Sequence, residues 1–247
     1  MSEQKKITKI CLLAGKIMLQ SGAETYRVED TMLRIAATFG VESAQSHATP
    51  TGIMFSMGET EPTNFVRIIT RSTDLHKVTQ VNSVSRNIAK GQLTVDEAHE
   101  QLHTIELEKH AYPIYLQIIA AALASGCFTI MFQGQWQDFM PAFIVGALGF
   151  SASVLFQQMV EIRFFAELLA SFIIGLCAYL FIYIGIGIEL DKIIIGSVMP
   201  LVPGLLITNA VRDLMAGHLV SGLSKGAEAF LTAFAIGAGV AVIFLII

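Results

Sequence analysis

The feature that most constrains this chain is the near absence of charge from its second half. Of the 36 Asp, Glu, Lys and Arg residues in the 247-residue sequence, 25 lie in the first 110 positions. The remaining part contains several charge-free apolar stretches of about 20 residues, the length that a helix needs to cross a bilayer. With 53% hydrophobic residues overall, the chain is too apolar for an ordinary soluble protein. The sequence therefore predicts a polar domain over residues 1–110 and a transmembrane domain over residues 111–247.

Five transmembrane helices are predicted in the second half, so the fold class is an α-helical membrane protein with a cytoplasmic N-terminal α/β domain. The third and fifth helices each carry one carboxylate near the start, Glu167 and Glu228. Either carboxylate is a candidate for carrying a coupling proton, although a simple position at the membrane interface is the better account of both. The predicted helices span residues 113–132, 139–160, 164–188, 193–211 and 226–247.

The charges of the loops predict the orientation in the membrane. If residues 1–110 lie in the cytoplasm, Lys192 is the only Lys or Arg in the outer loops, in agreement with the positive-inside rule. Five spans then place the C-terminus on the periplasmic side of a bacterial inner membrane. The basic residues of the inner loops are Lys109, Arg163, Arg212 and Lys225. A net charge of −4, with the basic residues dispersed among acids, argues against a nucleic-acid partner.

The polar half is predicted to have the element order α, α, β, β, β, α, α. Apolar residues recur at helical spacing over residues 7–18 and 28–39. Ser21 with Glu24, and Thr94 with Glu97, have the spacing of capping boxes at helix starts. The later helices are expected at residues 74–90 and 94–109. The β-favouring segments that would form a small sheet with a hairpin are residues 41–48, 52–57 and 65–70.

Residues 99–103, HEQLH, fit a pattern that places two imidazoles and a carboxylate on one helix. His99, Glu100 and His103 would then form a zinc site in a membrane-anchored hydrolase. A catalytic zinc needs a third protein ligand, and His110 is one residue out of register for that role. We therefore expect a charge-rich helix that leads to the membrane, with no metal or other cofactor and no enzyme activity.

The fourth predicted span is broken by Pro203 and Gly204, with Pro200 as a further break. The candidate site residues lie at the break and after it, at Pro203, Gly204, Asn209, Arg212 and Asp213. Proline in a helix removes one backbone hydrogen bond, and freed carbonyls in hydrocarbon must line a cavity or be covered by protein. Asn209 and Asp213 are four residues apart and share a helix face. These five residues are the predicted substrate path. The alternative is that Arg212 and Asp213 anchor the topology just outside the membrane.

Two stretches resemble the threonine/serine exporter family of the ThrE/YjjP type. VPGLLITNAVRDLMAGHLVSGLSKGAEA is similar to its signature of a Pro-Gly pair followed by Asn, Asp and Gly, here Asn209, Asp213 and Gly217. LLAGKIMLQSGAETYRVEDTMLRIAATFG is similar to the pattern between its first two helices. The positions that match that pattern are Gly22, Ala23, Thr25 and Arg27.

The resemblance implies a subunit of an inner-membrane secondary exporter of small carboxylate metabolites. Members in a single chain carry about ten spans, so five spans resemble the larger subunit of the split, two-component form. The implied partners are the lipid bilayer and a smaller membrane subunit or further copies of the chain, and the substrate is threonine or serine, or a dicarboxylate such as succinate. No G-x-x-x-x-G-K-[ST] pattern occurs, so an ion gradient rather than ATP is expected to drive export. The two alternatives to an exporter are the membrane-anchored zinc hydrolase and a membrane sensor or scaffold without transport.

Overall fold

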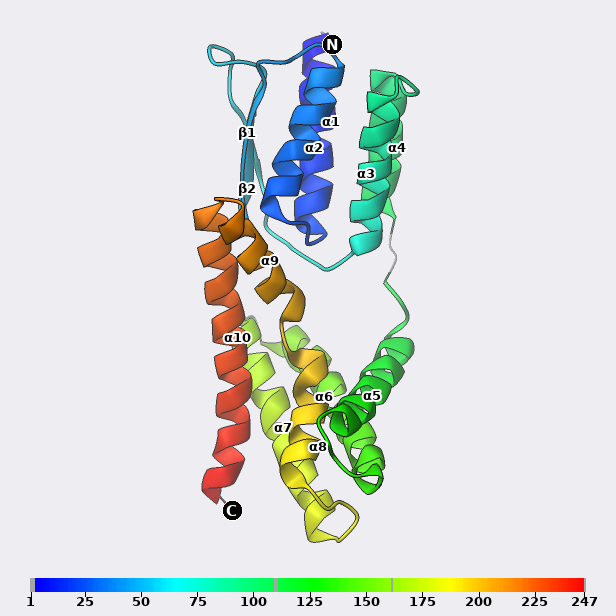
Figure 1. Ribbon diagram of the computed structural model, residues 1–247, viewed down its shortest axis with the longest axis vertical. Helices are drawn as coiled ribbons and strands as arrows, with labels where there is room; N and C mark the ends of the chain where they lie inside the picture. Colours follow the sequence, from blue (N-terminus) through cyan, green and yellow to red (C-terminus); the bar gives the residue numbers. More distant parts are fainter. Residues whose placement is uncertain (1–2, 109–110, 161, 247) are drawn as a thin grey trace. The chain divides into compact units, whose positions relative to one another are not determined.

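The computed structural model describes residues 3–108, 111–160 and 162–246. Contacts divide the chain into two compact units, which we call unit one and unit two (Figure 1). Unit one comprises residues 1–111 and 205–226, and unit two comprises residues 112–204 and 227–247. Residues 205–226, which the sequence analysis assigned to the transmembrane domain, therefore belong to the same compact unit as the polar half. The division into a polar domain and a transmembrane domain stays a prediction.

Unit one begins with two helices that lie side by side, α1 (Glu3–Gln20) and α2 (Thr25–Thr38). Their apolar residues recur every three or four positions and therefore share one face of each helix. That face is buried against the sheet and against the later helices α3 (Leu75–Ala89) and α4 (Val95–Leu107). The largest fully buried side chains of this core are Ile10, Met18, Val28, Met32, Ile35, Ile53, Phe55, Ile88 and Leu102.

The predicted sheet forms as an antiparallel meander of three strands in the order β1-β2-β3. The strands are β1 (Gln45–Thr49), β2 (Gly52–Ser56) and β3 (Asn64–Arg67). The register pairs Thr49 with Gly52 across the hairpin turn. Because β1 begins at Gln45, the first predicted strand segment, residues 41–48, started four residues too early.

The two predicted capping boxes have different outcomes. Thr94 and Glu97 form one at the start of α4, where the Thr94 hydroxyl accepts from the Glu97 backbone N–H and the Glu97 carboxylate accepts from the Thr94 N–H. The prediction for Ser21 and Glu24 is wrong, because Glu24 itself is the N-cap residue of α2 and its side chain makes no capping hydrogen bond.

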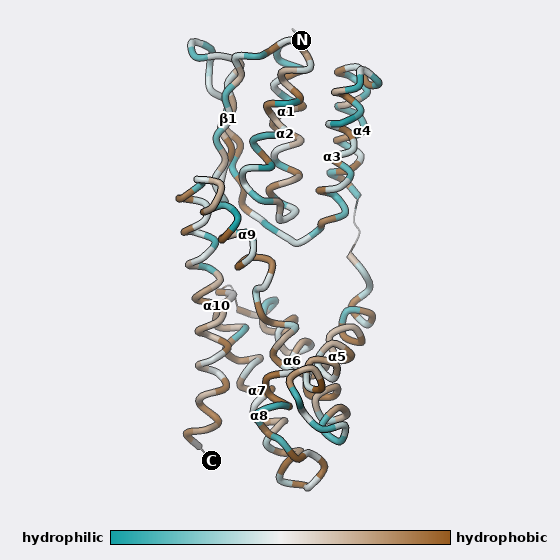
Figure 2. The backbone as a smooth tube through the Cα atoms, viewed as in Figure 1, coloured by the Kyte–Doolittle hydropathy of each residue, from teal (hydrophilic) through white to brown (hydrophobic). Residues whose placement is uncertain are grey.

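Most of the long apolar helices lie in unit two. Among the described residues, four helices are long and apolar enough to cross a membrane, α5 (Ile114–Met131), α6 (Trp136–Met159), α7 (within Arg163–Tyr183) and α10 (Leu219–Ile246). Two shorter helices, α8 (Leu190–Val198) and α9 (Gly204–Met215), form a bent pair. If this pair is one broken span, the number of candidate spans rises to five. Figure 2 shows hydrophobic residues predominating along α5 and α7, whereas hydrophilic residues recur along α3 and α4.

The break in the fourth predicted span lies where the prolines predicted it. The helix α8 passes into the short 3-10 helix η1 (Met199–Leu201), and Val202 then takes an extended backbone conformation. A new helix, α9, begins at Gly204 directly after Pro203. Proline lacks the N–H that would continue the ladder, so the chain can restart a helix there but cannot carry one through.

Helices α5, α6 and α8 pack closely through small residues. A Cβ on Gly146 of α6 would overlap Ser125 of α5, and a Cβ on Gly196 of α8 would overlap Thr129 of α5. Close approach of this kind lets neighbouring backbones gain van der Waals contact, which is a main source of helix association in a bilayer.

Candidate functional site

The candidate site is built on two turns of unit one that are far apart in sequence. The first turn joins α1 to α2. Gly22 has φ +88°, a conformation that L-residues rarely adopt, and the next N–H, of Ala23, donates to the Met18 carbonyl at 3.0 Å. This closure of α1 lets the chain reverse and start α2 at Thr25.

The second turn joins α9 to α10. Gly217 has φ +86°, and the His218 N–H donates to the Asp213 carbonyl at 2.9 Å. The helix α10 starts at Leu219, so Lys225 lies in its second turn rather than in a loop. The reversal brings Lys225 back to Asp213, twelve residues earlier in the chain.

Asp213 is the centre of the site and has no exposed surface. Its Oδ1 accepts from the Thr25 backbone N–H at 2.8 Å. Its Oδ2 accepts from the Thr25 hydroxyl at 2.9 Å and from the Lys225 ammonium at 2.7 Å. Lys225 is also buried and donates to the Thr25 hydroxyl at 3.2 Å and to the Ala23 carbonyl at 3.5 Å. The three donors of the ammonium are therefore all used inside unit one.

Asp213 supplies the cap that α2 lacks in its own sequence. The first backbone N–H groups of a helix have no partner within the helix and attract anions. Thr25 is the first residue of α2, and its N–H is satisfied by a carboxylate 188 positions later. The capping box predicted from Ser21 and Glu24 does not form because Ser21 belongs to the end of α1, where its N–H donates to the Ile17 and Met18 carbonyls.

Two neutral contacts extend the same interface within unit one. The Asn209 side-chain amide, which is almost fully buried, donates to the Gly22 carbonyl at 2.8 Å. The Ser221 hydroxyl donates to the Ala48 carbonyl at 3.3 Å. In both contacts a side-chain donor satisfies a backbone carbonyl.

Glu24 joins two arginines at the edge of this cluster. Its carboxylate oxygens lie 2.5 Å from Nη1 of Arg212 and 3.1 Å from Nη1 of Arg27. The Glu24 side chain is 6% exposed, whereas those of Arg212 and Arg27 are 56% and 40% exposed. Burial by itself would raise the pKa of Glu24, but the hydrogen bonds from its own backbone N–H and from the two guanidinium groups outweigh burial and lower that pKa.

The lowered pKa of Glu24 gives a pH-dependent prediction. A carboxyl group whose pKa falls on folding contributes stability that is complete above its unfolded value and is lost as the pH falls through the folded value. We expect Glu24→Gln to lower the thermal stability of the protein at pH 7. The difference from wild type should shrink as the pH falls below the ordinary value of 4.5. Thermal unfolding followed by circular dichroism over this range measures it.

The control for this prediction is Glu59→Gln, which changes an exposed carboxylate between β2 and β3. It should leave the unfolding temperature unchanged at every pH. If the loss in Glu24→Gln were equally large at pH 7 and well below 4.5, the carboxylate charge would not be the source of the stability.

The structure brings two groups of predicted site residues together. Gly22, Ala23 and Thr25 contact Asn209, Asp213 or Lys225 directly, and Arg27 reaches Arg212 through Glu24. Four further predicted site residues lie in unit two: Pro203, Gly204, Glu167 and Glu228. Glu167 is buried in α7, and Glu228 is half-buried in α10.

Lys225 and Glu24 are the site residues that the sequence reasoning missed. Lys225 looks like an ordinary loop charge before an apolar run. The available signal is that it is the only Lys or Arg after Arg212. Glu24 fits a capping box so well that its role as an ion-pair partner is hidden.

The HEQLH residues lie on α4. His99 and His103 have ring centroids 6.3 Å apart, and His103 Nδ1 lies 3.6 Å from a Glu106 carboxylate oxygen. Burial and the nearby charges of Lys9 and His103 lower the pKa of His99. His110 lies outside the described residues, and no group of three or more His, Cys, Asp or Glu within the described residues is placed to hold a metal ion.

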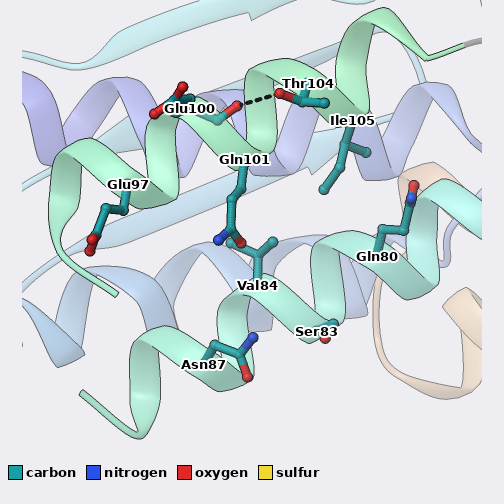
Figure 3. A pocket seen from close by; sticks show the side chains of 9 residues that line it. All are labelled: Gln80, Ser83, Val84, Asn87, Glu97, Glu100, Gln101, Thr104 and Ile105. Carbon is teal, nitrogen blue, oxygen red and sulfur yellow. Dashed lines mark hydrogen bonds between the residues drawn. The ribbon is translucent and has the colours of Figure 1, made fainter. Parts of the chain in front are cut away.

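Glu100 of the same motif lines an open pocket of about 510 Å³ between α3 and α4, which His99 does not line (Figure 3). In Figure 3, Gln101 points toward Val84 across the pocket. His99 instead lines a small pocket near the start of α1, together with Lys6 and Asp96. The imidazole and the carboxylate that a zinc hydrolase would need together therefore face different spaces.

Several long apolar helices, one of them broken, define a multi-pass membrane protein. The chain belongs to the threonine/serine exporter family, ThrE, whose sequence profile matches residues 9–247. This is a transporter family, as the resemblance of the two motifs predicted. No solved structure matches the chain.

Individual relatives are distant but match along nearly the whole chain. A probable succinate transporter subunit, YjjP, of Klebsiella aerogenes is 25% identical over 97% of this chain and 93% of its own length. YjjP of Escherichia coli is 24% identical over 96% of this chain and 93% of its own length. A probable threonine/serine exporter of Mycobacterium tuberculosis is 24% identical over 93% of this chain. The match covers only 44% of the mycobacterial protein, so this chain corresponds to less than half of it.

Proposed function

We propose that this chain is one subunit of a secondary exporter of small carboxylates, either threonine and serine or a dicarboxylate such as succinate. The observation that carries the proposal is the pair of exposed guanidinium groups, Arg27 and Arg212, which are held side by side by the buried carboxylate of Glu24. Within the described part of the chain, each guanidinium makes one side-chain hydrogen bond and keeps further N–H donors free. A planar fork of such donors matches the geometry of a carboxylate.

The substrate path in this proposal follows the segment from Pro203 to Asp213. The break at Pro203 and Gly204 gives α9 an N-terminus of its own, whose positive end favours an anion, as in the broken helices of other transporters. Arg212 contacts the substrate carboxylate, while Asn209 and Asp213 shape the path and fasten the turn that carries Arg27. An ion gradient drives the cycle.

A second membrane subunit completes the exporter in this proposal. The relatives called YjjP are named as subunits, and the mycobacterial exporter is more than twice as long as the segment that matches this chain. We place the protein in a bacterial inner membrane with residues 1–110 in the cytoplasm, as the loop charges predict.

The test is efflux from cells loaded with labelled serine, threonine or succinate, with and without this chain and its partner. Pro203→Ala should slow efflux because it allows α9 to extend backward as a continuous helix and removes the helix N-terminus at the break. Pro141→Ala, in α6, is the matched control and should export normally. Normal efflux from Pro203→Ala at normal amounts in the membrane would remove the break from the path, and no efflux of any of the three compounds by wild type would remove the proposed function.

A further inference from the structure

Asp138 is a buried carboxylate that lies outside both sequence motifs of the exporter family. It lies in the first turn of α6 and has no exposed surface. Its Oδ1 accepts from the backbone N–H groups of Ile188 at 2.7 Å and Glu189 at 3.3 Å. Its Oδ2 is buried without a hydrogen-bond partner, and among the residues that the structure describes no cation pairs with this carboxylate. Asp138 therefore combines full burial, one unused oxygen and no counter-ion.

The surroundings of Asp138 contain few other charges. The helix α5 has none, and Asp138 is the only charged residue within α6. Lys192 is the nearest basic residue in sequence to the loop that Asp138 holds, and its ammonium lies 3.5 Å from an Asp191 carboxylate oxygen. The remaining charged residues of α7, α8, α10 and the α7–α8 connection within unit two are Arg163, Glu167, Glu189 and Glu228.

Two opposing effects act on the carboxylate. Burying a charge without a counter-ion costs several kcal/mol, which favours a neutral, protonated acid. The two backbone N–H groups just before α8, together with the positive end of that helix, favour the anion. An ionisable group in this balance, in a segment that crosses or borders a membrane, is a candidate for a functional proton site.

We infer that Asp138 is a proton-binding site that controls how firmly α6 holds the N-terminus of α8. A proton from water adds to Oδ2, and the carboxylate becomes a neutral carboxylic acid. A neutral oxygen accepts more weakly than a charged one, so the hydrogen bonds from Ile188 and Glu189 weaken on protonation. The helix α8 is the first half of the broken fourth span, so its release would change the segment that ends at Pro203.

The meaning of this site for transport rests on the proposed function, but proton binding itself does not. If the chain is a proton-driven exporter, Asp138 is the coupling group, ahead of Glu167 and Glu228. The simpler possibility is that Asp138 is a permanent anion that only caps α8. The two possibilities differ in whether the group changes its protonation state in the folded protein.

The experiment is infrared difference spectroscopy of the purified full-length protein in lipid nanodiscs, titrated from neutral to acid pH. Wild type should show a protonated carboxyl band that shifts when the aspartates carry carbon-13. Asp138→Asn, which keeps an acceptor oxygen, should lose this band. Asp191→Asn, which changes a 63% exposed aspartate on α8, should retain it. Amide hydrogen exchange at Ile188 and Glu189, corrected for its intrinsic pH dependence, should accelerate with acid in wild type and stay constant in Asp138→Asn.

Three results would overturn the inference. One is a titrating aspartate band that survives in Asp138→Asn, and another is protection of the Ile188 and Glu189 amides that is independent of pH in wild type. If Asp138→Asn fails to insert, the carbon-13 measurement on wild type still decides, because absence of any titrating buried aspartate would leave Asp138 a fixed cap. None of these readouts depends on efflux, so their failure is distinct from failure of the proposed function.

Discussion

Lys225→Met is expected to lower the free energy of unfolding by about 3–5 kcal/mol, the usual cost of removing one partner from a buried ion pair. The Asp213 carboxylate has no exposed surface, and Lys225 is the cation that contacts it, at 2.7 Å. After the substitution, the carboxylate stays buried with only the Thr25 N–H and hydroxyl as donors. Denaturant unfolding of the purified protein in micelles, followed by circular dichroism, measures the change.

The control variant, Arg34→Met, removes an exposed ion pair between Asp30 and Arg34 on α2. Arg34→Met should cost less than about 1 kcal/mol, because exposed pairs at this spacing contribute little. A loss in Lys225→Met no larger than in Arg34→Met would show that water reaches the Asp213 cluster and that the pair is not buried in solution.

The elements of the fold could be predicted to the extent that they depend on local pattern. The apolar runs predicted the four long helices because a bilayer requires a minimum apolar length. Pro203 predicted the break in the fourth span because proline cannot continue a helix. Thr94 and Glu97 predicted the start of α4 because both halves of that capping box lie within one turn.

The errors come from contacts between distant parts of the sequence. Local spacing favoured a capping box from Ser21 and Glu24, but Asp213 occupies the start of α2 and leaves Glu24 to the arginines. A one-dimensional pattern cannot show that Ser21 closes α1, or that an aspartate 188 positions away accepts the first N–H of α2. Asp138 was missed for a similar reason, since its partners are backbone groups 50 and 51 residues later.

The resemblance identified most residues of the site, but it did not predict that the two motifs bind each other. Gly22 and Gly217 have positive φ angles at the two turns, which gives a physical reason for glycine at both positions. Asn209 and Asp213 were proposed to face a substrate, and the structure shows their polar atoms engaged with Gly22 and Thr25. Their part in the substrate path stays a proposal.

The double variant Asp213→Asn with Lys225→Met is expected to be nearly as stable as wild type but to export at one tenth of the wild-type rate or less. That loss of rate corresponds to a rise of at least about 1.4 kcal/mol in the transport barrier. Replacing a buried ion pair by neutral groups of similar volume is often neutral or stabilising. The Asn209 contact is untouched, and the new asparagine still offers an acceptor to the Thr25 N–H. What the double variant removes is the pair of charges at the end of the proposed path.

The comparison of stability with export decides what the buried pair is for. If the buried ion pair only stabilised the fold, a neutral pair of similar volume would replace it without loss, and efflux per molecule would be unchanged. We expect instead that normal amounts of well-folded protein reach the membrane and that efflux is lost, with Asp213→Asn alone losing both. Arg34→Met should export normally and serves as the control for a change of charge in the same unit. If the double variant exported at the wild-type rate, the Asp213 cluster would only hold the α1–α2 and α9–α10 turns together. The substrate path would then not include this cluster.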